Sequence, residues 1–258
     1  MDASQLPLSL SGLALVSMTR NYQYTIRRLL FGILIVAATL AVFVGPVQRA
    51  REASRRAECM NHLKLLTMAW MNYESARGRY PARTAADERL SWRAIVPYYM
   101  CMEYRQIDPN APWNSPNNAR FSIPPTDGLQ CCNREDASSP FIQVFAVSAP
   151  SSLWRNAPIS RKDVTDKRSD TLVLIELDLD RVHWMSPTDV TLDELIEMLR
   201  QNGRLPSPHP GGAIMSFADG SVKFVPHELI TPELLRAIVS IDGDERLGAR
   251  LENLEDAR

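Results

Sequence analysis

One long apolar stretch near the N-terminus dominates the hydrophobic pattern of this chain. Residues 29–44 carry no charged side chain, and residues 45–48 extend the uncharged stretch. A helix needs about 20 apolar residues to cross a bilayer, so the pattern predicts a transmembrane segment at 29–47. A cytoplasmic leader at 1–28 would precede it, with residues 1–20 poorly ordered. A cleaved signal peptide is the alternative, but its apolar part is usually only about 7 to 15 residues long. We therefore favour an uncleaved anchor.

The pattern then changes to that of an amphipathic helix. Residues 47–77 contain neither glycine nor proline. Apolar side chains recur there at intervals of three or four residues, at Cys59, Leu63, Leu66, Trp70 and Tyr73. This spacing places them on one stripe of a helix, which a sheet or other helices must cover. We expect one helix to run from the membrane to about residue 77 and to end at Gly78.

Period-two alternation in the second half of the chain predicts strands. Residues 142–147 and 171–177 are apolar and β-branched, and Asp219-Gly220 between two alternating segments is typical of a hairpin. A two-residue type I′ loop at Asp219-Gly220 would pair Phe217 with Val222 and Met215 with Phe224. Ser216 and Lys223 would then share the opposite, polar face.

Capping signals predict two further helices. Thr191 and Glu194 form a capping box before an amphipathic segment that Gly203 ends, and Thr231-Pro232 opens another helix. Residues 91–99 indicate a short helix, followed by a loop rich in proline and asparagine. The fold class is therefore α+β, with a long N-terminal helix packed on a C-terminal antiparallel β-sheet. We divide the rest of the chain into a domain at 78–245 and a charged tail at 246–258.

Composition and charge limit the classes of partner that we expect for this chain. The chain has 258 residues and a formal net charge of -1, which gives no electrostatic reason to expect nucleic acid. Arginines flank both ends of the apolar stretch, and the larger number after it leans toward a cytoplasmic C-terminal domain. Four cysteines lack the Cys-x2-Cys spacing of a zinc site. We expect a membrane as partner and no nucleic acid.

His209 and Asp219 are the first candidates for chemistry, but we interpret both as structural. Asp219 serves the predicted turn, and His209, with Gly211 and Gly212 after it, would hold the start of the strand by hydrogen bonds to the backbone. A hydrolase would also need a nucleophile and an orienting group. We expect no catalytic residue, metal ligand or cofactor, and treat His209, Gly211, Gly212, Asp219 and Gly220 as structural residues.

A second set of candidates alternates along one strand, at Glu176, Asp178 and Asp180. A calcium site there is one interpretation, although calcium loops usually bring glycine and more oxygen ligands together. We favour a solvated strand edge. The alternative function that these residues leave open is an envelope-exposed metal-binding enzyme or sensor that uses His209 and this carboxylate face.

Several segments together resemble a bacterial pilin-like family, the domain of unknown function 1559 family. They are the stem at residues 45–64, Ser91-Trp92-Arg93, the loops at 107–118 and 207–212, and the His-x9-Asp-Gly pattern from His209 to Gly220. The resemblance extends over roughly Tyr24 to Val239. It implies a pilin-like fold and a non-enzymatic structural or interaction protein of the cell envelope, linked to a type II secretion (pseudopilin) or type IV pilus-like assembly. Its partners would be other pilin-like subunits or envelope proteins.

The chain departs from the family at the processing signal. Gln23 stands where relatives have the glycine at which a prepilin peptidase cuts, and Arg28 replaces a glutamate. Both differences argue against cleavage and favour a permanent single-pass anchor. The resemblance implies a cytoplasmic (inner) membrane protein with its C-terminal domain outside the cytoplasm.

The exterior location that the resemblance implies would allow a disulfide. Cys59 and Cys131 are the first choice, because both positions resemble family cysteines. Cys132 is the other candidate partner of Cys59, and four free thiols are the remaining alternative.

Overall fold

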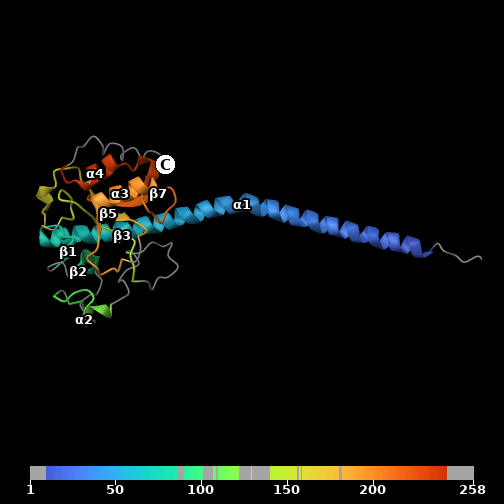
Figure 1. Ribbon diagram of the computed structural model, residues 1–258, viewed down its shortest axis with the longest axis horizontal. Coiled ribbons are helices and arrows are strands. Elements are labelled where there is room, and N and C mark those ends of the chain that lie inside the picture. Colours follow the sequence, from blue (N-terminus) through green and yellow to red (C-terminus); the bar gives the residue numbers. More distant parts are fainter. Residues whose placement is uncertain are drawn as a thin grey trace, which may run out of the picture. The chain divides into compact units, whose positions relative to one another are not determined.

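The computed structural model describes residues 10–85, 90–100, 107–108, 110–121, 129, 140–155, 157, 159–179 and 182–242 (Figure 1). The chain divides into two compact units, residues 1–53 and 54–258. Helix α1, Leu10–Arg77, belongs to both. Residues 10–20 are therefore helical, whereas we expected a poorly ordered leader.

The part of α1 from residue 29 to residue 44 carries no charged side chain. Its most apolar window has a mean hydropathy of 2.5 and no buried residue, and side chains such as Leu29, Phe31 and Leu34 are more than half exposed. Pro46 lies inside the helix. By length and composition, this is the one helix among the described residues that could cross a membrane. It indicates single-pass membrane anchoring, as the sequence predicts.

The part of α1 in the second unit is a core helix. The predicted stripe is buried at Cys59, Leu63, Leu66 and Trp70, each at most 3% exposed. Trp70 stacks on Tyr80, with ring centroids 4.3 Å apart. The helix ends at Arg77, and Gly78 follows with a φ of +69°. The stop predicted at Gly78 is confirmed.

An antiparallel sheet carries the rest of the core. Its strand order is β3 (Val144–Phe145), β5 (Leu172–Glu176), β7 (Gly212–Phe217) and β8 (Val222–Pro226). Every residue of β5 and β7 is buried, so both faces of the sheet are covered. Helix α1 lies on one face, where the Arg56 guanidinium is 4.7 Å from the Phe224 ring centroid. Helices α3 (Leu192–Asn202) and α4 (Pro232–Val239) lie on the other side (Figure 1). The predicted α+β class is confirmed.

The β7–β8 hairpin is present, but its register differs from the prediction by one residue. Met215 pairs with Lys223 and Ser216 with Val222. The Gly220 N–H donates to the Phe217 carbonyl at 2.9 Å, and Gly220 has a φ of +90°. These features describe a three-residue loop with glycine in the left-handed region rather than a two-residue type I′ turn.

The extra loop residue changes which side chains share a face. Lys223 lies on the same face as Met215 and Phe217, and its Nζ is 5.6 Å from the Phe217 ring centroid. It is only 7% exposed. The predicted polar face of Ser216 and Lys223 is therefore wrong.

Both predicted capped helices are confirmed. Thr191 and Glu194 form the capping box of α3, which Gly203 ends, and Thr231 caps α4. Two other predictions need correction: residues 142–147 divide between two short strands, and residues 91–99 form two 3₁₀ turns rather than one helix. The remaining short elements are β1 (Thr84–Ala85), β2 (Leu90–Ser91), α2 (Pro116–Ala119), β4 (Val147–Ser148), β6 (Val190–Thr191) and 3₁₀ turns at Trp92–Ala94, Val96–Met100, Arg161–Asp163 and His227–Leu229.

Candidate functional site

Three side chains with metal-ligating chemistry meet in the core between α1 and the sheet. Cys59 comes from α1, Glu176 from the end of β5, and His209 from the loop before β7. Their sulfur, carboxylate and imidazole ligand atoms all lie within 4.8 Å of one another. The His209 Nε2 is 3.3 Å from the Glu176 Oε2. All three residues are at most 3% exposed. We call this set the Cys59 cluster.

Glu176 corrects the prediction of a solvated strand edge. β5 is an inner strand between β3 and β7, not an edge strand, and Glu176 is buried. Asp178 lies beyond the strand, is exposed, and accepts a hydrogen bond from the Gln143 amide at 3.1 Å. Asp180 lies outside the described residues. Glu176 and Asp178 therefore face different surroundings and do not form the shared carboxylate face that the calcium interpretation requires.

His209 is positioned by its own loop and by the two glycines that follow. Its backbone N–H donates to the Ser207 Oγ at 3.2 Å. Gly211 has a φ of +93°, which side-chain-bearing residues rarely adopt. A Cβ on Gly212 would lie 2.4 Å from the carbonyl oxygen of Val225. The two glycines thus allow the loop to turn and β7 to approach β8 closely.

Asp219 lies at the other end of β7 from His209. Its Oδ1 accepts hydrogen bonds from the Ser221 N–H at 2.9 Å and the Ser221 hydroxyl at 2.7 Å, and its side chain is exposed. The six residues of β7 separate it from His209, a span of about 20 Å at the usual rise of a strand. The two residues therefore cannot act on one ligand. Gly220 stands in the left-handed region beside Asp219.

The sequence interpretation missed Glu176 as the neighbour of His209 and missed Cys59 as the third member. One signal was present: Glu176 is the single charged residue in the apolar segment from Leu172 to Leu177. A carboxylate in a continuous buried strand needs a partner. The predicted partner of Cys59, Cys131, lies outside the described residues, as does Cys132, so the disulfide stays a prediction.

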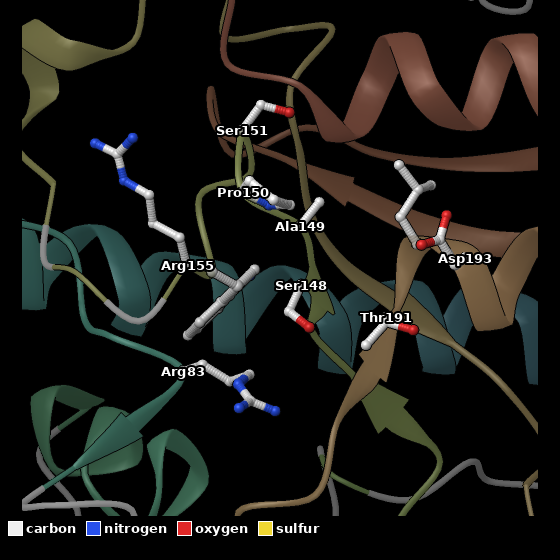
Figure 2. A pocket seen from close by; sticks show the side chains of 10 residues that line it. Arg83, Ser148, Ala149, Pro150, Ser151, Arg155, Thr191 and Asp193 are labelled. Atoms are coloured by element: carbon white, nitrogen blue, oxygen red, sulfur yellow. The ribbon is translucent and has the colours of Figure 1, made fainter.

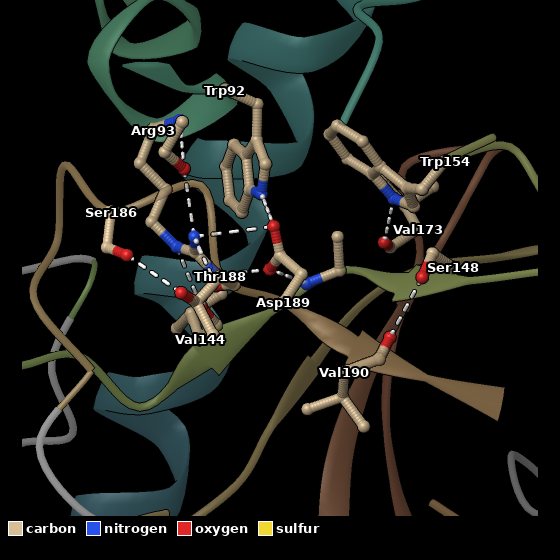
Figure 3. Close-up of polar contacts among 12 residues, drawn as sticks. Trp92, Arg93, Val144, Ser148, Trp154, Val173, Ser186, Thr188, Asp189 and Val190 are labelled. Atoms are coloured by element: carbon tan, nitrogen blue, oxygen red, sulfur yellow. Dashed lines mark hydrogen bonds and ion pairs between the residues drawn. The ribbon is translucent and has the colours of Figure 1, made fainter. Parts of the chain in front are cut away.

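A second buried polar centre joins Arg93 to Asp189 (Figure 3). Both side chains are fully buried. The guanidinium also donates to the Val144 carbonyl at 3.1 and 3.2 Å and to the Ser91 Oγ at 2.9 Å. The Asp189 carboxylate accepts further hydrogen bonds from the Trp92 indole N–H at 3.1 Å and from the Ala146 N–H at 2.9 Å.

Burial shifts the pKa values of both members of this pair toward their neutral forms. Burial raises the pKa of Asp189 and lowers the pKa of Arg93, because removal from water disfavours each charged form. Their mutual attraction and hydrogen bonds oppose both shifts. Because its polar atoms bond to three separate chain segments, the pair connects residues 91–93, 144–146 and 188–189. We assign it a structural role.

A surface pocket lies elsewhere, beside the start of α3 (Figure 2). It has a volume of about 490 Å³, and its polar lining includes Arg83, Arg155, Ser148 and Asp193. In Figure 2 the two arginine side chains extend in different directions, so they do not converge on one anion. No member of the Cys59 cluster lines this pocket.

Comparison with known proteins identifies the family. Residues 48–171 match the family model described as a protein of unknown function, DUF1559. The match includes the stem with Cys59 and ends before Glu176 and His209. A search of curated proteins and a search of solved structures each found no match. The suspected family is thus confirmed over residues 48–171, which match the DUF1559 family, whereas the pilin-like character and the His-x9-Asp-Gly pattern stay predictions.

Proposed function

We propose that this protein is a non-enzymatic, pilin-like component of the cell envelope that presents its α+β domain to partner proteins. The observation that carries the proposal is that α1 has two roles. One helix supplies an apolar segment fit to cross a membrane and, further along, the buried stripe of the domain core. Such a helix attaches a folded domain to a membrane without a separate linker.

The non-enzymatic part of the proposal is supported by the burial of the Cys59 cluster. Its side chains are in the core, where a substrate has no access. The exposed pocket beside α3 places no histidine or cysteine near its serines, and acyl transfer needs a base next to the nucleophile. The alternative of an enzyme or sensor requires His209 and a shared face of Glu176 and Asp178. Asp178 does not share the surroundings of the other two residues, so this face is not formed.

The proposed orientation has the domain outside the cytoplasm and the anchor in the inner membrane. Arg27 and Arg28 immediately before the apolar segment would remain on the cytoplasmic side. In a pilin-like assembly, partners would be other pilin-like subunits or components of a type II secretion system. The substituted processing signal at Gln23 and Arg28 supports an anchor that is kept rather than cut.

Two measurements test the proposal. N-terminal sequencing of the protein purified from membranes should find no new N-terminus at Tyr24, and a start at Tyr24 would refute the permanent anchor. Protease added to intact spheroplasts should digest the domain while a cytoplasmic marker survives. A domain that resists digestion until the membrane is lysed, yet is digested afterwards, would refute the exterior location.

The alternative function is tested by His209→Ala in the full chain. Loss of folding with no loss of a specific activity supports the structural proposal. A folded variant that loses an activity measurable in the unsubstituted protein would support an enzyme or sensor.

A further inference from the structure

We infer that the Cys59 cluster is a structural zinc site that joins the stem helix to the sheet. The inference goes beyond the proposed function and does not depend on it. It rests on a thiol, an imidazole and a carboxylate that three separate elements bring within 4.8 Å of one another in the core.

The spacing of His209 and Glu176 matches that of two ligands on one ion. Zinc binds nitrogen and oxygen ligands at about 2.0–2.2 Å in a tetrahedral arrangement, which places two such ligands about 3.4 Å apart. The His209 Nε2 and Glu176 Oε2 are 3.3 Å apart. N–H···O hydrogen bonds usually measure about 2.7–3.2 Å, and the Oε2 accepts no hydrogen bond from the part of the chain that the structure describes.

Burial makes this carboxylate oxygen costly without compensation. Glu176 is 3% exposed, and a buried carboxylate is tolerated only when it is paired, hydrogen-bonded or bound to a metal. With zinc bound, the Glu176 carboxylate and the Cys59 thiolate contribute two negative charges, and neutral His209 contributes none. The ion's two positive charges balance them, so the buried site is neutral.

The donor set selects zinc among common ions. Calcium and magnesium prefer oxygen ligands throughout, whereas sulfur and imidazole nitrogen are ligands typical of zinc. The three side chains fill three positions of a tetrahedral ion and leave the fourth for a water molecule. Binding requires that the Cys59 thiol give its proton to solvent.

A zinc ion here would cross-link three elements of the domain. It would link α1, β5 and the loop before β7, and would stabilise the domain only in its folded form, because the three ligands are far apart in the unfolded chain. The disulfide predicted between Cys59 and Cys131 uses the same sulfur, so the two cannot coexist in one molecule.

The test uses the full-length chain in detergent, stripped of metal by a chelator and titrated with Co²⁺ as a spectroscopic substitute for Zn²⁺. We expect a thiolate-to-cobalt charge-transfer absorption that saturates at about one equivalent, as for a single site with a thiolate ligand, and that Zn²⁺ abolishes. Cys59→Ser should remove this absorption. Glu176→Gln and His209→Gln should weaken binding by at least about tenfold, whereas the control His227→Gln should bind as the unsubstituted chain does.

The cobalt titration of the unsubstituted protein can by itself refute the inference. The test therefore does not depend on whether the variants fold. Folded, reduced chain that gives no thiolate absorption refutes the site. A signal that persists in Cys59→Ser, or that His227→Gln weakens as much as His209→Gln does, refutes the assigned ligands. Peptide mapping without reduction that finds Cys59 bridged to another cysteine in the membrane-extracted protein also refutes it and supports the disulfide.

Discussion

Removal of the Asp189 carboxylate should strongly destabilise the domain. In Asp189→Ala, the fully buried Arg93 guanidinium loses its only charged partner among the described residues, and such a loss costs about 3–5 kcal/mol. The Trp92 indole N–H and the Ala146 N–H also lose their acceptor, at about 1–3 kcal/mol for each buried donor. These costs overlap, so we expect a total loss of at least about 4 kcal/mol, a large part of the roughly 5–15 kcal/mol that stabilises a typical domain.

Urea unfolding of the full chain in detergent micelles, followed by tryptophan fluorescence, measures this loss. Arg93→Met, Asp189→Leu and the double variant Arg93→Met/Asp189→Leu form a double-mutant cycle with the unsubstituted protein. We expect the double variant to be less destabilised than the sum of Arg93→Met and Asp189→Leu by roughly 0.5–3 kcal/mol, because the second substitution removes the charge left unpaired by the first. A loss below about 1 kcal/mol in Asp189→Ala, or strict additivity in the cycle, would refute the assigned role of the pair.

Substitutions at three further positions test other parts of the structure by thermal unfolding. Gly212→Ala should cost at least about 1–3 kcal/mol, because its Cβ would lie 2.4 Å from the Val225 carbonyl oxygen; an unchanged melting temperature would contradict this close approach. Thr191→Ala should cost about 1 kcal/mol by removing the acceptor for the Glu194 N–H, and Thr191→Ser, which keeps a hydroxyl, should cost less. Partial burial lowers the pKa of His183, so its contribution to stability is present above the ordinary histidine pKa and is lost as pH falls toward the lowered one. His183→Gln should flatten this acid dependence, and an equally steep dependence in the variant would exclude His183 as its source.

The parts of the fold that the sequence predicted correctly depend on local signals. The stem stripe from Cys59 to Trp70 follows helical spacing, and the capping box at Thr191 needs only residues within one helical turn. The hairpin was also recognised, but not its register, because Asp219-Gly220 fits both a two-residue loop and a three-residue loop with Gly220 in the left-handed region. The two loops differ in whether Ala218 belongs to the loop or to the strand, and an alanine is compatible with both positions.

The buried polar centres could not be predicted in the same way because they join distant segments. Arg93 and Asp189 are 96 positions apart, and Ala146 between them contributes only a backbone N–H. Glu176 was misplaced for a related reason. Its alternation with Asp178 indicated a solvated face, but burial depends on whether a strand lies inside or at the edge of a sheet, which is a property of the strand order.

The position of the unit boundary within α1 determines where proteolysis could release the domain. Arg51 and Arg55 flank the boundary at Ala53 and have exposed side chains. Cleavage by a trypsin-like enzyme at either position would leave the downstream piece with every buried residue from Cys59 to Trp70, and so with an intact core. Cleavage at Lys64 would instead divide that set between two fragments. Release of the domain with this part of its core intact would therefore require cleavage in the part of the helix that precedes Cys59.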